Sequence, residues 1–141
     1  MCLRCDGFEW DEIDRRTDLL IRVHGYMLVH VEAAAPWTYT VGARESWDRP
    51  ELVMVDMAAE MQKTLVGAVA DDYVMFGEIR DDTLDLLDVE LAVVDASHLS
   101  AGLVATWEQH YAMSASTGDV VQIIPGPSWR CSRVRRLDSG R

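Results

Sequence analysis

Cysteines and histidines are the residues of this sequence best suited to bind a metal. Cys2 and Cys5 stand three positions apart, and two thiolates at this spacing can share one tetrahedral zinc ion. A closed site needs two further ligands, and Cys131 and His24 are candidates for them. Because no second Cys-x-x-Cys is present, zinc, iron, a disulfide, a redox pair and plain reduced thiols all stay open.

A dense aromatic stretch over residues 36–56, PWTYTVGARESWDRPELVMVD, is the clearest indication of a binding site. The candidate ligand-binding residues are Trp37, Tyr39, Thr40, Gly42, Trp47 and Glu51. Aromatic walls with a few polar groups are typical of small-molecule pockets, and Arg44 and Arg49 would lie near the mouth of this one. In the alternative interpretation, Trp37 and Tyr39 belong to the core and Trp47 covers an edge.

No catalytic motif can be recognised, since the chain has no G-x-S-x-G, no P-loop and no G-x-G-x-x-G. Glu45 and Glu51 flank the aromatic loop and could act as a general acid–base pair. A catalytic carboxylate such as Glu51 should be buried, with a perturbed pKa. Whether the protein is an enzyme therefore stays open.

The elements expected to position these residues are short helices and strands in an irregular order. Apolar residues at helical spacing predict a helix over 9–23, another after Asp56 and a third after Ser100. Alternating or continuous apolar runs predict strands over 24–32, 37–42, 51–56, 73–79, 84–95 and 119–124, with a loop over 44–50. The strand over 51–56 is apolar on both faces, which indicates a buried, central position.

This order predicts an α+β fold, with a mainly antiparallel sheet of about six strands and three helices packed on one face or end. The segments 73–79 and 84–95 are expected to form a hairpin around the turn RDDT, with the acidic residues on its solvated face. The length of 141 residues favours one domain, over 1–129, followed by an arginine-rich tail over 130–141.

Composition narrows the classes of partner. The net charge of −11 argues against nucleic-acid binding, which needs a basic face. No apolar run approaches the roughly 20 residues that a membrane span needs, and the N-terminal segment has no secretion signal, so a cytoplasmic location is expected. An unidentified small molecule or protein remains as the partner, and a homodimer is left open.

Several motifs together resemble a known family. His24-Gly25, Pro36-Trp37, the run from Tyr39 to Gly42, Pro50-Glu51-Leu52, His98-Leu99 and the run from Val121 to Ile123 follow its pattern, as does the Cys-x-x-Cys-Asp start. On these residues the chain resembles the domain of unknown function 4262. The resemblance implies that Trp37, Tyr39, Thr40, Gly42 and Glu51 belong together around one turn between two strands. Arg49 stands where the family usually has His, and Tyr26 where it has Trp.

Three functions remain in competition. The first is a small binding or interaction module with a pocket at the segments 37–42 and 47–51. The second is a structural or regulatory protein that binds zinc or iron through Cys2 and Cys5. The third is an enzyme of unidentified chemistry.

Overall fold

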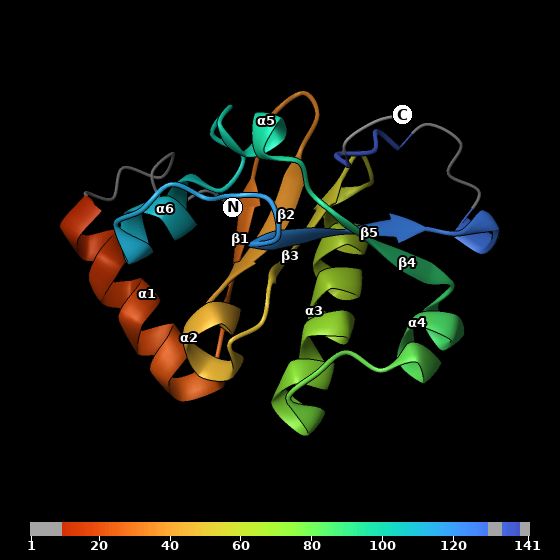
Figure 1. Ribbon diagram of the computed structural model, residues 1–141, viewed down its shortest axis with the longest axis horizontal. Coiled ribbons are helices and arrows are strands. Elements are labelled where there is room, and N and C mark those ends of the chain that lie inside the picture. The colour runs from red at the N-terminus through yellow and green to blue at the C-terminus, as the bar shows by residue number, and fades with distance from the viewer. Residues whose placement is uncertain (1–9, 130–133, 139–141) are drawn as a thin grey trace.

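The computed structural model of the protein describes residues 10–129 and 134–138, and within them five strands form one sheet (Figure 1). The strands are β1 (Met27–Val31), β2 (Trp37–Val41), β3 (Glu51–Val55), β4 (Val89–Val93) and β5 (Val120–Pro125). The helices are α1 (Trp10–His24), α2 (Ala43–Trp47), α3 (Ala59–Phe76), α4 (Asp81–Leu87), α5 (Ala96–Leu99) and α6 (Ala105–Tyr111), and a 3-10 turn spans Pro127–Trp129. None of the described helices is long and apolar enough to cross a membrane.

The sheet is mixed, with the strand order β1-β2-β3-β5-β4. β1, β2 and β3 form an antiparallel meander, in which Met27 lies opposite Val41 and Trp37 lies opposite Val55. β5 is inserted between β3 and β4, parallel to β3 and antiparallel to β4. The prediction of an α+β fold with a mainly antiparallel sheet is therefore confirmed, with one parallel pair in its centre.

Helices cover both faces of the sheet. All five residues of β3 are buried, and they alternate between the two sides. Val53 and Val55 belong to the core that also contains residues of α1, α5 and α6, whereas Leu52 and Met54 belong to the core formed with α3. Figure 1 shows α1 and α6 on one side of the sheet and α3 and α4 on the other. The predicted central strand is confirmed, and the predicted placement of helices on one face or end is wrong.

The predicted strand over residues 73–79 is wrong, because the segment begins as the last turn of α3. Leu65, Val69 and Tyr73 are buried at four-residue intervals, so the helical stripe continues past the expected boundary. The helix ends where Gly77 takes a φ of 73°, and the Gly77 amide donates to the Tyr73 carbonyl. The apolar side chain of Val74, which suggested a strand, lies half exposed on the outer side of the helix.

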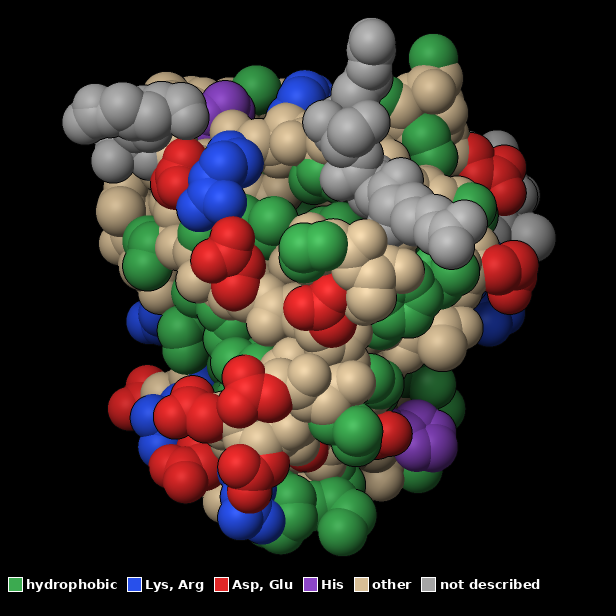
Figure 2. Space-filling model, turned by 90° about the vertical axis from the view of Figure 1, so that its right-hand side faces the viewer, with side chains coloured by type: hydrophobic (Ala, Val, Ile, Leu, Met, Phe, Trp, Pro, Cys, Tyr) green, Lys and Arg blue, Asp and Glu red, His purple; other side chains and the backbone are tan. Residues whose placement is uncertain are grey.

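The structure also contains helices that the sequence did not predict. Residues 81–87 form α4 in place of the expected hairpin, and α2, over residues 43–47, overlaps the loop expected over 44–50. The described chain therefore has five strands where about six were predicted, and six helices where three were predicted. Acidic side chains gather on the side that carries α4 and β4 (Figure 2), where Asp81, Asp82 and Asp85 are exposed.

Residues 134–138 pack against the rest of the molecule. The Arg135 guanidinium makes two hydrogen bonds to the Asp56 carboxylate, 2.8 Å from Nε to Oδ2 and 3.0 Å from Nη2 to Oδ1. Leu137 is buried in the core on the α6 side, and the Arg136 Nη1 donates to Glu90 over 3.0 Å. Burial raises the pKa of Asp56, but the hydrogen bonds and charge of Arg135 outweigh burial and lower this pKa below its usual value.

Candidate functional site

The buried carboxylate of Glu51, the first residue of β3, lies at the centre of the candidate site. Its side chain is fully buried and accepts hydrogen bonds from five donors. The donors to Oε1 are the Thr40 hydroxyl at 2.8 Å and the Ala43 amide at 3.1 Å. The donors to Oε2 are the Arg44 amide at 3.1 Å, the Trp107 indole at 3.2 Å and the Gly42 amide at 3.3 Å.

These five contacts show which protonation state suits the site. Burial raises the pKa of Glu51, and the hydrogen bonds from Thr40 and from the amides at the start of α2 oppose that rise. Four of the five neighbours are N–H groups, which can only donate, and the Thr40 hydroxyl donates to Oε1. A proton on Oε2 would therefore point at another donor. The ionised form is therefore the one that matches the arrangement. Glu51 thereby ties the first turn of α2 to the start of β3 and to α6.

Thr40 and Gly42 explain why the chain turns so tightly between β2 and α2. The Thr40 hydroxyl accepts from the Leu52 amide at 2.9 Å while it donates to Glu51, so it bridges the two strands where the regular ladder ends. Gly42 has a φ of 124°, and a Cβ there would lie 2.8 Å from the Gly25 carbonyl oxygen. Only glycine fits this conformation and this close approach.

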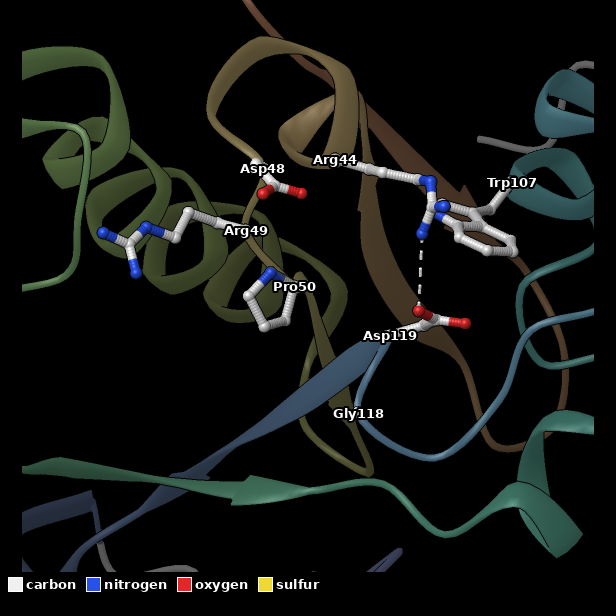
Figure 3. Close-up of a pocket in the computed structure, with 7 residues that line it drawn as sticks. All are labelled: Arg44, Asp48, Arg49, Pro50, Trp107, Gly118 and Asp119. Atoms are coloured by element: carbon white, nitrogen blue, oxygen red, sulfur yellow. Dashed lines mark ion pairs between the residues drawn. The ribbon is translucent and has the colours of Figure 1, made fainter.

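A small cavity of about 130 Å³ opens beside this turn (Figure 3). Its lining residues are Arg44, Asp48, Arg49, Pro50, Trp107, Gly118 and Asp119. They come from α2, from α6 and from the loops before β3 and β5, so the cavity lies at the amino ends of the parallel pair. Figure 3 shows Arg44 extending toward Trp107 and Asp119, with Asp48 directed into the same space, whereas Arg49 points away.

Arg44 is the charged residue whose side chain extends most directly into this cavity (Figure 3). Its Nη1 lies 3.6 Å from Asp119 Oδ1, and its Cζ lies 6.0 Å from the centre of the Trp107 ring and 5.8 Å from that of Tyr111. Its backbone amide is bound by Glu51 at 3.1 Å. Glu51 therefore fixes the backbone of Arg44, whereas the guanidinium lies beside Asp119 and the two rings and 44% of the side chain stays exposed.

The six residues predicted to bind a ligand divide into groups. Thr40, Gly42 and Glu51 converge in one network. Trp37 donates to the Leu103 carbonyl at 2.8 Å, and the buried Tyr39 hydroxyl accepts from the Thr106 amide at 3.0 Å, so both point toward the α6 side. Trp47 lies on the other face of the sheet, where its ring stacks on Tyr73 at 5.5 Å and a Cβ on Gly25 would meet it at 2.6 Å.

The predicted metal ligands fall mostly outside the described residues. Cys2, Cys5 and Cys131 lie there, and His24 is exposed at the end of α1. Within residues 10–129 and 134–138, no group of three His, Cys, Asp or Glu side chains is placed to hold a metal ion.

Sequence reasoning missed the contribution of α6 to the site. Trp107 reaches Glu51 from 56 positions away, and nothing in the local pattern signals this contact. The neighbouring His110 lies between Glu45, to which its Nε2 is hydrogen-bonded, and Asp18, 3.5 Å from its Nδ1. This histidine therefore links α6 to both α2 and α1.

Comparison with known proteins agrees with the motifs gathered around Glu51. The family described as "Domain of unknown function (DUF4262)" matches residues 20–124, a range that contains β1 to β4 and most of β5. No curated protein and no solved structure matches the chain significantly.

Proposed function

Since the chain belongs to the DUF4262 family of domains of unknown function, we propose a function from its own residues: a small binding module that holds an anionic small molecule in the cavity beside α2. The observation that carries this proposal is that Arg44 is positioned beside the cavity by the buried residues Glu51 and Trp107. Glu51 holds the backbone of α2, and Trp107 contacts both the Glu51 carboxylate and the Arg44 guanidinium. A site fixed before the ligand arrives loses little conformational freedom on binding.

The chemistry of the cavity defines the class of ligand. A guanidinium binds carboxylate or phosphate groups with two parallel hydrogen bonds. The Arg44–Asp119 pair, at 3.6 Å, is longer than an ordinary hydrogen bond, so an incoming anion competes with a loose contact. Asp48 on the facing wall favours a hydrogen-bond donor, such as an ammonium or a hydroxyl, at the other end of the ligand.

The size of the cavity limits the ligand to a small molecule. A volume of about 130 Å³ is close to that of an engineered protein cavity of roughly 150 Å³ that binds benzene. Small amino acids, hydroxy acids and phosphorylated two- or three-carbon compounds are therefore the classes to test first.

The test is an NMR titration of the ¹⁵N-labelled protein with these three classes and with inorganic phosphate. We expect one class to shift the amide signals of Arg44, Asp48 and Asp119. Arg44→Gln should weaken that binding about 10- to 100-fold, as expected for loss of a charged hydrogen-bonding partner. Arg80→Gln is the matched control, because the Arg80 side chain is 49% exposed and lies outside the cavity lining. No shift with any compound, or unchanged binding by Arg44→Gln, would overturn the proposal.

A second candidate function is metal binding through Cys2 and Cys5, completed by Cys131 or His24. The spacing of the two N-terminal cysteines favours it. The test is the metal content of protein purified without chelator or affinity metal, measured beside a Cys2→Ser/Cys5→Ser double variant. About one zinc or iron per chain, lost in the variant, would support the site, and absence of metal from both proteins would contradict it.

A further inference from the structure

The segment of residues 134–138, VRRLD, is held to the rest of the molecule through its backbone. The Gln122 side chain of β5 donates from Nε2 to the Arg135 carbonyl over 2.7 Å and accepts at Oε1 from the Leu137 amide over 2.8 Å. The Asp95 amide donates to the Leu137 carbonyl over 2.6 Å. Hydrogen bonds to alternate residues of one segment are the pattern by which proteins hold an extended peptide.

The side chains of this segment also have their own binding positions. The Asp56 carboxylate accepts two hydrogen bonds from the Arg135 guanidinium, of 2.8 and 3.0 Å, and a third from the Arg135 amide over 2.9 Å. Leu137 is 3% exposed and belongs to the core on the α6 side. Arg136 faces Glu90 at the surface, with 3.0 Å between Nη1 and Oε1. The main contacts therefore select an arginine followed two positions later by a leucine.

Two of the groups that hold the segment bind nothing else within residues 10–129 and 134–138. Gln122 is fully buried, and both polar atoms of its side-chain amide are bonded to the segment alone. The Asp56 carboxylate is bonded to Arg135 alone. A buried amide without partners is costly, so Gln122 needs a peptide backbone or water in this place. The surface is therefore suited to a peptide backbone as well as to an apolar side chain.

The segment comes from beyond the family domain, whereas the residues that hold it lie inside the domain. The family match covers residues 20–124, a range that includes Asp56, Asp95 and Gln122. The binding surface therefore belongs to the domain, and this chain supplies an occupant for it from outside the domain.

The attachment of the segment allows exchange with another chain. Leu137 is the only buried side chain among residues 134–138. The Arg135 and Arg136 side chains are 57% and 40% exposed, although both form ion pairs. Exposed ion pairs are weakened by salt and contribute little stability, so a similar segment of a partner can compete for the same surface.

We propose that this surface is a peptide-binding site, which residues 134–138 occupy as a tethered ligand and which an extended Arg-x-Leu segment of a partner protein takes over. The backbone of that segment binds Gln122 and Asp95, its arginine binds Asp56, and its leucine takes the position of Leu137. None of these residues lines the cavity beside α2, so the inference does not rest on anion binding there. The tethered segment lowers the apparent affinity for the partner to the extent that it keeps the site occupied.

The test is the fluorescence anisotropy of a labelled VRRLD peptide mixed with the full chain or with its Arg135→Glu variant. The variant places a carboxylate opposite Asp56, so the tethered segment is released and the site becomes free. We expect the variant to bind the peptide at least about tenfold more tightly than the wild type does, because the segment no longer competes. Arg80→Glu is the matched control, since Arg80 is 49% exposed in the connection between α3 and α4, and it should bind the peptide as the wild type does.

Two changes test the contacts that define the ligand. The peptide VERSD, which lacks the arginine and the leucine of the proposed motif, should not bind. Asp56→Asn, added to Arg135→Glu, should weaken the binding of VRRLD at least about tenfold, because the arginine of the peptide loses its charged partner. Asparagine tolerates the φ of 61° at position 56, so this substitution leaves the backbone in place.

Circular dichroism shows whether each variant is folded. No binding of VRRLD to a folded Arg135→Glu variant, equal binding by the wild type, equal affinity for VERSD, or no effect of Asp56→Asn would overturn the proposal. If Arg135→Glu does not fold, an NMR titration of the ¹⁵N-labelled wild type decides. Excess VRRLD should then displace the tethered segment and shift the amide signals of Arg135 and Leu137, and unchanged signals would overturn the proposal.

Discussion

Replacing Glu51 by glutamine tests whether an ionised carboxylate holds the turn between β2 and β3. The substitution keeps the shape of the side chain and removes its charge. If the amide oxygen takes the position of Oε2, it keeps the amides of Gly42 and Arg44 and the indole of Trp107. The amide nitrogen then occupies the position of Oε1, 3.1 Å from the Ala43 amide, and two donors face each other.

The size of the effect follows from these contacts. Leaving the buried Ala43 amide without an acceptor costs about 1–3 kcal/mol. The three retained hydrogen bonds lose their charge assistance, which roughly halves the strength of each. Because glutamine is neutral, the variant avoids part of the free-energy cost of burying a charge. This gain offsets part of the loss from the weakened hydrogen bonds. We therefore expect the free energy of unfolding to fall by about 3 kcal/mol at pH 7, within the range for breaking buried charged networks.

The assay is urea denaturation followed by circular dichroism, with Glu60→Gln as the control. The Glu60 side chain is 90% exposed, so its substitution should change the unfolding free energy by less than about 0.5 kcal/mol. If Glu51→Gln were equally harmless, the carboxyl would have to be protonated in the folded protein. The inference that an ionised Glu51 holds α2 in place would then be wrong.

Two further predictions concern the same end of the sheet and its first strand, β1. Gly42→Ala should destabilise the protein by at least about 2 kcal/mol in urea denaturation, because residue 42 has a φ of 124° and the added Cβ would lie 2.8 Å from the Gly25 carbonyl oxygen. Gly67→Ala is the control: Gly67 lies within α3 and no atom lies within 4 Å of the added Cβ, so this substitution should stabilise the protein slightly. Burial lowers the pKa of His30, so the unfolded chain takes up a proton near pH 6.5 before the folded chain does. The wild-type unfolding free energy should therefore decrease as the pH falls from 6.5 to 5. His30→Gln should lose this slope and exposed His24→Gln should keep it, and an unchanged slope in His30→Gln would contradict the assignment.

Much of the sheet could be predicted from the sequence, because strand patterns there are set by neighbouring residues. The alternation around Val29 and the continuous apolar run from Leu52 to Val55 both follow the burial of each strand's own side chains. The secondary structure after Val69 was harder to predict, because the exposed apolar side chains on the last turns of α3 give the apolar pattern typical of a strand. The parallel pairing of β3 with β5 has no local signal, since it depends on how the intervening helices pack.

Part of the candidate site could be predicted from the sequence and part could not. Thr40, Gly42 and Glu51 lie within twelve residues of one another, and their motif places them around one turn. The partners that complete the network and the cavity, Trp107 and Asp119, come from distant segments that meet only in the folded protein. Local spacing can indicate that a turn is special, but it cannot identify the side chains that close over it.

The insertion of β5 between β3 and β4 has a consequence for the order of folding. The β1–β2–β3 meander and α3 are complete once the nascent chain has passed Phe76, whereas β5 ends only at Pro125. Until then β3 has one unpaired edge, and β4 has no neighbour in the sheet. Contacts between segments so far apart in sequence form slowly, because the intervening chain must first be ordered. We therefore expect the placement of β5 to be the late step of folding, and chains stalled before residue 120 to be the form most prone to aggregation.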